Sequence, residues 1–273
     1  MSKLLCGICP QDCMLEDGQT GFCRARTRYG DEILANNYGR VTSMALDPIE
    51  KKPLRHFCPG SMIFSVGSYG CNLRCPFCQN HEISMTDERI GSVFLPPEAL
   101  LEKALELRGN IGVAFTYNEP LIGYEYIRDC AALLKENGLK TVLVTNGYIH
   151  EEPMKKLLPH IDAMNIDLKA FTEDYYLTLK GHLEPVKRTI ALCAPRCHVE
   201  ITTLIVPESN DSEEEMRQLS SWLAVVDKKI PLHISRFFPR YHMTETYATP
   251  VERIKRLAAV AREVLDNVYT GNC

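Results

Sequence analysis

A short apolar run, Met62-Ile-Phe-Ser-Val66, is followed directly by Gly67-Ser-Tyr-Gly-Cys71-Asn-Leu-Arg-Cys75-Pro-Phe-Cys78. The apolar run has the length and composition of a strand that is buried on both faces. Glycine and proline in the second stretch favour a turn-rich loop, so three cysteines lie together just after the strand. The carboxyl ends of parallel strands carry the functional sites of open α/β sheets and βα barrels. This stretch therefore predicts a thiol-rich site at such an edge.

The chain repeats the same alternation of strand and helix after this stretch. Five more apolar runs of strand length follow, over residues 111–116, 141–145, 164–168, 199–206 and 232–236. Helical patterns separate them: Pro97 opens one, Ser212 and Glu215 form a capping box before another, and Pro250 opens the last. Repeated βα units predict an α/β fold with a parallel sheet, either open and doubly wound or curved into a partial barrel.

Residues 1–60 differ from the rest of the chain. They contain Cys6, Cys9, Cys13 and Cys23, a glycine-rich turn, and a hairpin signal around Gly30. We therefore predict two parts: a small Cys-rich N-terminal appendage over residues 1–60 and an α/β domain over residues 61–273.

The composition is that of a soluble globular protein, with 45% hydrophobic and 24% charged residues among 273. It argues against a disordered or fibrous chain. With 31 Lys and Arg against 35 Asp and Glu, the net charge is −4, so nucleic-acid binding is not expected. The N-terminus lacks the apolar run of a signal peptide, and no stretch reaches membrane-spanning length. These features predict a cytoplasmic protein without a membrane partner.

Twelve cysteines are many for a chain of this length and too few for a disulfide scaffold. Clustered cysteines in the cytosol are more often metal ligands or redox groups than bridges. The four N-terminal cysteines suit a second metal site, which holds either tetrahedral zinc or an auxiliary iron–sulfur cluster. Their spacing does not distinguish zinc from a cluster. A third alternative is that the four thiols bind no metal. The scattered cysteines are predicted to serve packing, and they are Cys58, Cys130, Cys193, Cys197 and Cys273.

Three thiols without a close fourth ligand suit a metal centre with an open coordination position. A structural zinc site needs four ligands, and His81 is the nearest residue after Cys78 that would complete a zinc knuckle. Three cysteines on a four-iron cluster instead leave one iron free to bind a small molecule. We favour the cluster because the group follows a buried strand of a βα array.

The Cys-x3-Cys-x2-Cys spacing, with Phe77 just before the last cysteine, resembles the signature of the radical S-adenosylmethionine (SAM) superfamily. The resemblance covers residues 61–240. It implies a partial (β/α)6 barrel similar to the TIM barrel, a 4Fe-4S cluster on Cys71, Cys75 and Cys78, and SAM on the fourth iron. Reductive cleavage of SAM then gives methionine and a 5′-deoxyadenosyl radical. An electron donor such as flavodoxin or ferredoxin is implied as a partner.

Later strand ends resemble the SAM-binding segments of glycyl-radical activating enzymes such as pyruvate formate-lyase activating enzyme. A carboxylate at Glu119 suits the cationic amine of SAM, although an acid there also stabilises a helix start. Asp167 and Lys169 alternate along one strand face, as SAM ligands or as a structural ion pair. His233 is the alternative to His242, but it lies inside an apolar strand, where a core histidine is commoner. The candidate cofactor-binding residues are therefore Phe77, Asn118, Glu119, Asn146, Asp167, Lys169 and His242.

The N-terminal cysteine array, residues 45–54, the Cys71–Asn80 segment and Thr116–Pro120 together resemble the radical SAM enzyme of the AmmeMemoRadiSam system. This resemblance implies a Memo-like protein and an Amme-type domain as partners, and a Cys-rich tail in longer relatives. It leaves the substrate open.

Three arginines in the appendage, Arg24, Arg26 and Arg28, alternate along the chain. On a strand they would share one face, which either docks an acidic protein or a phosphate-bearing substrate or is an ordinary solvated face.

We therefore expect a radical SAM enzyme that abstracts a hydrogen atom from an unidentified substrate. Activation of a glycyl-radical enzyme is the alternative within that class, and the substrate is then a protein. A non-catalytic iron–sulfur or zinc protein for electron transfer or scaffolding is the alternative of another class. Four residues fall near the expected mouth of the barrel without an assigned role, namely Tyr175, Tyr176, Glu200 and Arg236.

Overall fold

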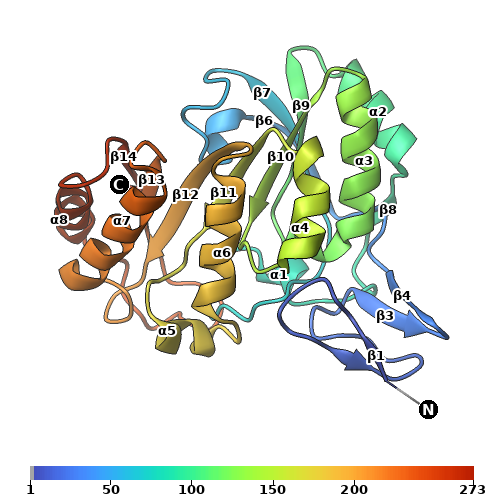
Figure 1. The fold of residues 1–273 in the computed structure, drawn as a ribbon, viewed down its shortest axis with the longest axis horizontal. Coiled ribbons are helices and arrows are strands. Elements are labelled where there is room, and N and C mark those ends of the chain that lie inside the picture. The colour runs from blue at the N-terminus through green and yellow to red at the C-terminus, as the bar shows by residue number, and fades with distance from the viewer. Residues whose placement is uncertain (1–2) are drawn as a thin grey trace.

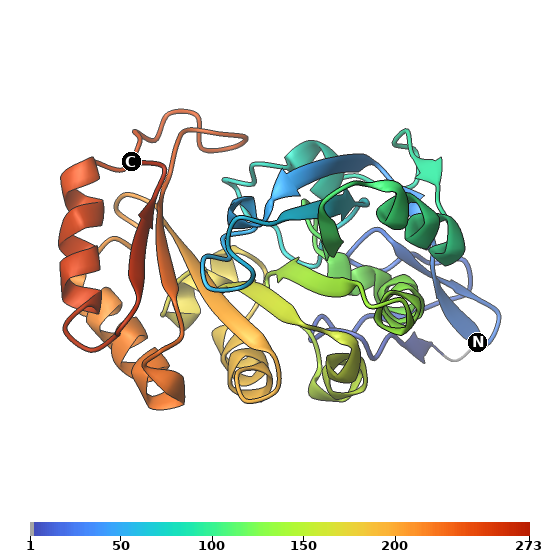
Figure 2. The ribbon, with the colours of Figure 1, turned by 90° about the horizontal axis from the view of Figure 1, so that it is seen from above.

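The computed structural model describes residues 3–273. Its centre is an eight-stranded sheet in the order β14-β13-β12-β11-β10-β9-β7-β6. The strands are β6 (Ser43–Pro48), β7 (Met62–Gly67), β9 (Asn110–Phe115), β10 (Lys140–Thr145), β11 (Ala163–Asp167), β12 (His198–Ile205), β13 (Leu232–Arg236) and β14 (Val268–Gly271). Neighbouring strands are parallel except for β6 and β7, which are antiparallel. Figure 2 shows that the sheet curves, with helices along its outer side.

The helices follow the strands along the chain and cover the outer face of the sheet (Figure 1). Their apolar stripes explain this: α3 buries Tyr124, Ile127, Ala131 and Leu134, which recur at helical spacing. The α-helices are α1 (His81–Ser84), α2 (Pro97–Glu106), α3 (Tyr124–Glu136), α4 (Glu151–Leu157), α5 (Glu173–Thr178), α6 (Leu183–Cys193), α7 (Glu213–Asp227) and α8 (Val251–Ala261). Short 3-10 helices cover Ile49–Lys51, Pro120–Gly123 and Leu158–His160.

All six strands predicted from the sequence are present, each within one residue at either end. The curved parallel sheet with its outer helices confirms the partial barrel of the α/β class. Two strands of the sheet are missing from the prediction. Strand β14 has only four residues, and β6 has the sequence Ser-Met-Ala-Leu-Asp-Pro, so neither strand carries a long apolar run.

The predicted boundary between residues 60 and 61 separates two strands that pair with each other. Strands β6 and β7 are in register over six residues, from Ser43 opposite Gly67 to Pro48 opposite Met62. Residues 43–60 therefore share the main sheet and its core. We propose that the Cys-rich part is better bounded as residues 3–42, which we call the N-terminal module.

The N-terminal module is built from short antiparallel pairs. Strands β1 (Leu4–Leu5) and β2 (Met14–Leu15) pair, as do β3 (Arg26–Tyr29) and β4 (Glu32–Ala35). Strand β5 (Arg40–Val41) pairs with β8 (Val93–Phe94) from the barrel. The hairpin predicted around Gly30 is confirmed, since Gly30 takes a φ of +61° in the two-residue turn of β3 and β4.

The module lies at the carboxyl ends of the parallel strands, beside α1 and α4 (Figure 1). The His150 N–H, just before α4, donates to the Ile8 carbonyl at 3.0 Å. The Gln11 amide donates to the carbonyls of Asn72, in the cysteine loop, and Lys180. The module is therefore packed directly on the end of the barrel that carries the three-cysteine loop.

The arginine face predicted for the module is wrong, because two of its three members are buried. Arg26 makes a bidentate pair with Glu125 of α3, with both N···O distances at 2.7 Å. Arg28 donates to the carbonyls of Leu15 and Gly30. Only Arg24 is exposed. The other two arginines therefore hold the module in place and do not form a docking surface.

A strap of residues 53–57 crosses the inner face of the sheet and meets Glu200 of β12. The N–H groups of Arg55 and His56 donate to the two carboxylate oxygens of Glu200, at 3.0 and 2.7 Å. The ring of His56 contacts the Tyr269 hydroxyl on β14 at 2.6 Å. The strap thus joins both edges of the open sheet.

Glu200 has no exposed surface and is the third residue of β12, so it does not lie at the mouth of the barrel as the sequence suggested. His198 and His233 also bond its oxygens, at 2.9 and 2.6 Å. Burial alone would raise the pKa of Glu200, but these bonds hold it well below its usual value. His233 is a satisfied core histidine, which was the commoner case expected for it.

The capping box predicted for α7 is only half formed. Ser212 Oγ accepts from the Glu215 N–H at 3.1 Å, as expected. The Glu215 carboxylate turns away from the cap and accepts from the Phe171 N–H at 2.6 Å. Tertiary structure thus recruits this acid to hold the loop after β11.

Within residues 3–273, none of the helices has the length and apolar character needed to span a bilayer.

Candidate functional site

The three-cysteine loop begins where β7 ends at Gly67. Cys75 is buried, and Cys71 and Cys78 are half-buried. Burial and then the negative charges of Glu119 and the neighbouring cysteines raise the pKa of Cys71. Burial likewise raises the pKa of Cys75 to about 11. The three thiols therefore lie within electrostatic reach of one another, and burial shifts the pKa of two of them.

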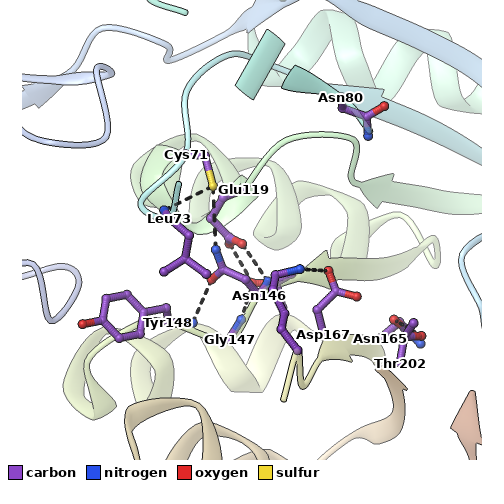
Figure 3. A network of polar contacts seen from close by, with 12 residues as sticks. Cys71, Leu73, Asn80, Glu119, Asn146, Gly147, Tyr148, Asn165, Asp167 and Thr202 are labelled. Atoms are coloured by element: carbon purple, nitrogen blue, oxygen red, sulfur yellow. Dashed lines mark hydrogen bonds and ion pairs between the residues drawn. The ribbon is translucent and has the colours of Figure 1, made fainter. Parts of the chain in front are cut away.

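The loop is held by amide side chains that the sequence analysis only partly recognised (Figure 3). Asn146, after β10, donates from Nδ2 to Asn72 Oδ1 at 2.9 Å and lies 3.8 Å from Cys71 Sγ. Asn72 Nδ2 in turn donates to the Tyr148 carbonyl at 2.7 Å. The Leu73 N–H points at Cys71 Sγ from 3.4 Å. Two N–H donors thus face the Cys71 sulfur, which favours the thiolate form of a ligand.

Both carboxylate oxygens of Glu119 accept hydrogen bonds from the protein in this structure. Its carboxylate accepts from Thr145 Oγ1 at 2.6 Å, from the Asn146 N–H at 2.7 Å and from the Leu121 N–H at 3.0 Å. It therefore ties the ends of β9 and β10 together, which is closer to the helix-start role kept as the alternative. Burial raises the pKa of Glu119 to about 7, although these bonds oppose the shift.

Asn118 braces the start of the cysteine loop. Its Oδ1 accepts from the Ser68 N–H at 2.9 Å, and its Nδ2 donates to the Gly70 carbonyl at 3.0 Å. Tyr117, just before it, has a φ of +73°, which is rare for a bulky residue. This strained backbone turns Asn118 and Glu119 toward the neighbouring strand ends.

Asp167 and Lys169 are brought together as expected, with Lys169 Nζ 2.9 Å from Asp167 Oδ2. Asp167 lies close to Asn146 (Figure 3). Burial opposes the ammonium charge, but Asp167 and the Cys75 thiol outweigh it, so the pKa of Lys169 is raised. The half-buried cation offsets negative charge on the cysteine loop.

The segment after β13 lies across the cysteine loop. The His242 N–H donates to the Pro76 carbonyl at 2.9 Å. The Tyr241 ring stacks on the His81 ring with 4.4 Å between the ring centroids, and the His242 ring lies tilted against the Tyr241 ring with 3.8 Å between their centroids. The His242 side chain is exposed, whereas Phe77 is buried in the main core. Of these two candidates, only His242 presents a polar group to the space above the loop.

The four N-terminal cysteines are free thiols close to this loop. Cys6, Cys9 and Cys23 are buried, and Cys13 is half-buried. The Phe22 N–H points at Cys13 Sγ from 3.4 Å. The Cys71 N–H donates to the Cys23 carbonyl at 3.2 Å, so the two cysteine groups are joined by a backbone hydrogen bond.

Across residues 3–273, no three side chains of Cys, His, Asp or Glu are grouped closely enough to hold a single metal ion. Cys130 and Cys193 are buried packing thiols, as predicted. Cys58 and Cys273 are exposed, so the packing role predicted for them is wrong.

Comparison with known proteins places this geometry in a family. The family model described as the Radical SAM superfamily matches residues 65–220. A Methanocaldococcus jannaschii protein, named uncharacterized protein MJ0808, is 39% identical over 99% of this chain and 82% of its own length. The pyruvate formate-lyase-activating enzyme of Clostridium pasteurianum is 27% identical over 72% of this chain and 89% of its own length.

Among solved structures, a domain of a pyruvate formate-lyase-activating enzyme from Bacteroides vulgatus is similar in fold. Its TM-score is 0.53 at 15% identity, over 59% of this chain and 99% of that chain. The protein therefore belongs to the radical SAM superfamily, with pyruvate formate-lyase-activating enzymes among its relatives. It is an enzyme of that class, so the non-catalytic alternative is set aside.

Proposed function

We propose that Cys71, Cys75 and Cys78 hold a 4Fe-4S cluster whose open iron binds SAM. When bound and reduced, this cofactor pair supplies a 5′-deoxyadenosyl radical for hydrogen abstraction from a substrate. The observation that carries the proposal is the set of three free thiols in the loop after β7, one buried and two half-buried, in a chain of this superfamily.

The residues present fit such a cluster. Each cysteine of a four-iron cluster binds its own iron, and hydrogen bonds to the sulfurs tune its potential. Cys71 Sγ already faces two N–H donors, from Leu73 and Asn146. Lys169 adds a half-buried positive charge that lowers the pKa of Cys75 against the effect of burial.

The candidate SAM residues then divide by what they already bind. Asn118 and Glu119 spend their polar atoms on the protein and are proposed to position the loop. Asp167 and Lys169 retain donor and acceptor capacity, and His242 is exposed, so we propose these for direct contact with SAM.

The remaining two candidates act from inside the protein. Asn146 is proposed to act through Cys71, since its amide donates toward that sulfur. Phe77 is proposed to pack beneath the loop and exclude water, because its ring is buried in the core.

The test is anaerobic reconstitution with iron and sulfide, followed by addition of a reductant and SAM and by assay for 5′-deoxyadenosine. Cys75→Ala should abolish SAM cleavage, whereas Cys130→Ala, which removes a buried thiol of α3, should retain it. Wild-type protein that carries a cluster yet never cleaves SAM, or cleavage by Cys75→Ala, would sink the proposal.

A glycyl-radical enzyme is a second candidate for the substrate. The 27% identity to a pyruvate formate-lyase-activating enzyme over 72% of the chain favours it. Reaction with a protein substrate should then give the doublet EPR signal of a glycyl radical. Steady release of 5′-deoxyadenosine without any protein radical favours another substrate instead.

Within the superfamily, we propose an enzyme of the AmmeMemoRadiSam type, with a Memo-like protein or an Amme-type domain as partner and flavodoxin or ferredoxin as electron donor. The support is the set of sequence segments over residues 45–54, 71–80 and 116–120. Pull-down from a source of the three proteins, with cleavage assayed using reduced flavodoxin, tests the partners and the donor.

The four N-terminal cysteines are proposed to bind a second metal centre, zinc or an auxiliary iron–sulfur cluster. The module has little apolar core of its own, with only Cys23 and Ala25 from it in the small cluster that includes Tyr69 and Ile122. Segments of this size usually need a metal or a bridge to fold. Metal analysis of a Cys6→Ala, Cys9→Ala double variant decides: loss of zinc indicates a structural site, and loss of four irons indicates a cluster.

A further inference from the structure

Residues 238–248, which we call the flap, leave the end of β13, and two hydrogen bonds close the base of this segment. The Phe237 N–H donates to Thr249 Oγ1 at 3.3 Å, and the Thr249 N–H donates to the Phe237 carbonyl at 3.2 Å. Thr249 is fully buried, so the base is a firm anchor. The position of the far end of the flap then depends on the contacts which that end makes.

The far end of the flap is a tight turn with a strained backbone. The Arg240 N–H donates to the Met243 carbonyl at 3.3 Å, and the Met243 N–H donates to the Arg240 carbonyl at 2.9 Å. Within this turn Tyr241 has a φ of +56°, which is costly for a bulky residue. Such a backbone persists only where its surroundings hold it in place. The turn therefore needs contacts outside the flap.

The ring of Tyr241 makes one such contact, with the residue that begins α1. That residue is His81, the third after Cys78. The two rings stack with 4.4 Å between their centroids and 21° between their planes. The buried Nδ1 of His81 has no hydrogen-bond partner among residues 3–273, so no polar bond at that atom holds the ring. Stacking on Tyr241 is thus a specific role for His81.

His242 adds a second contact between the flap and the cysteine loop. Its N–H donates at 2.9 Å to the carbonyl of Pro76, which lies between Cys75 and Cys78. Its ring lies against the Tyr241 ring, with 3.8 Å between the centroids, and its side chain is exposed. The turn is therefore attached to the cysteine loop at two points, and the His242 side chain is placed between them.

We propose that Tyr241 is a positioning residue, whose ring holds the flap on the cysteine loop and so fixes His242 for contact with SAM. The inference rests on the proposed function, since it takes His242 as a SAM contact. A flap that is held in advance is ordered before SAM binds, so SAM does not bear the entropy cost of ordering it. Without the stack, SAM has to order the flap itself and binds more weakly.

The first test needs no cofactor. Arg240 is exposed in the flap, and trypsin should cleave after it in proportion to the population in which the flap is detached. His81→Ala removes the stacking partner and leaves the cleaved bond unchanged. The fragment of residues 1–240 should then form about fivefold faster, which is the factor expected for one aromatic pair. His81→Phe is the matched control, since it keeps a ring, and it should be cleaved at the wild-type rate.

The second test is the Kd for SAM of the reconstituted, unreduced protein. Tyr241→Ala should raise this Kd by about fivefold. After reduction, kcat at saturating SAM should stay within about twofold of the wild type, because the stack acts on binding and not on the chemical step. Tyr241→Phe keeps the ring and should restore the wild-type Kd. Tyr247→Ala, which removes another tyrosine of the flap that contacts Glu208, should leave the Kd unchanged.

The outcomes separate the inference from the function on which it rests. A wild-type chain that assembles no cluster, or that binds no SAM, overturns the proposed function. With a functional wild type, unchanged cleavage in His81→Ala or an unchanged Kd in Tyr241→Ala overturns the role of Tyr241 alone. An equal rise of the Kd in Tyr247→Ala does the same. If Tyr241→Ala does not fold, the Kd is measured in His81→Ala. Failure of both variants to fold shows that the stack serves overall stability and also overturns the inference.

Discussion

Glu119 is a candidate SAM ligand whose carboxylate already accepts hydrogen bonds from the protein, and pH provides the sharpest test of its burial. Its folded pKa is raised from 4.5 to about 7 by burial. A carboxyl group with a raised pKa binds its proton more tightly in the folded state than in the unfolded state. Its contribution to stability therefore falls as the pH rises from 4.5 through 7.

The size of the effect follows from the two pKa values. For one group with pKa values of 4.5 unfolded and about 7 folded, linkage gives a loss of about 1 kcal/mol at pH 5 and about 3 kcal/mol at pH 8. The expected change between these pH values is about 2 kcal/mol. The glutamine in Glu119→Gln does not titrate, so the variant lacks this pH-dependent contribution to the free energy of unfolding.

The assay is urea unfolding of wild-type protein and Glu119→Gln at pH 5 and pH 8, without SAM. Taking the difference between the proteins at each pH cancels the titrating groups that are not coupled to Glu119. The free energy of unfolding of the wild type, relative to the variant, should fall by about 2 kcal/mol between pH 5 and pH 8. An unchanged difference, or a change of opposite sign, would refute the assignment of Glu119 as a buried carboxyl with a raised pKa.

Three further perturbations test other parts of the structure. Glu200→Gln places an amide N–H opposite the N–H donors of the strap. It should lower the free energy of unfolding by about 3 kcal/mol, since a buried donor left unpaired costs about 1–3 kcal/mol. Urea unfolding that is the same as for the wild type would contradict the contact between Glu200 and the strap. Arg26→Met leaves Glu125 without its partner and should cost up to about 3 kcal/mol, because Glu125 is only partly buried. Limited proteolysis should then cut the N-terminal module before the barrel, and uniform resistance would argue against this anchor. Asn146→Ala removes a donor to Cys71 Sγ, so the cluster potential should become more negative while iron content stays near the wild-type value; an unchanged potential would exclude that contact from tuning the cluster.

Strand positions were predictable because a strand that is buried on both faces has an unbroken run of apolar residues. An unbroken apolar run such as residues 199–206 identifies β12 without any knowledge of its neighbours. Strands β6 and β14 lack such a run, because they lie at the edges of the sheet and pair on one side only. The boundary predicted after residue 60 falls between two paired strands for the same reason, since β6 is recognisable only through its register with β7.

The candidate site was predictable in its cysteines and less so in its polar residues. The spacing of Cys71, Cys75 and Cys78 is set by ligand chemistry within a single loop, so a short sequence window contains it. Whether a carboxylate faces a ligand or the protein depends on groups elsewhere in the chain. Glu119 meets Thr145 and Asn146, which lie 26 and 27 residues away. Asn72 left no signal that could separate it from an ordinary loop residue.

By itself, the sequence determined the class of fold, the superfamily and the cysteines that we propose as cluster ligands, because each depends on residue types at fixed local spacing. Only the tertiary structure decided which polar groups are already paired. It paired Glu119 and Arg26 with protein partners, and it placed Glu200 against the strap instead of at the mouth of the barrel. Hydrogen-bond satisfaction is a property of groups brought together from distant segments, and no local pattern encodes it.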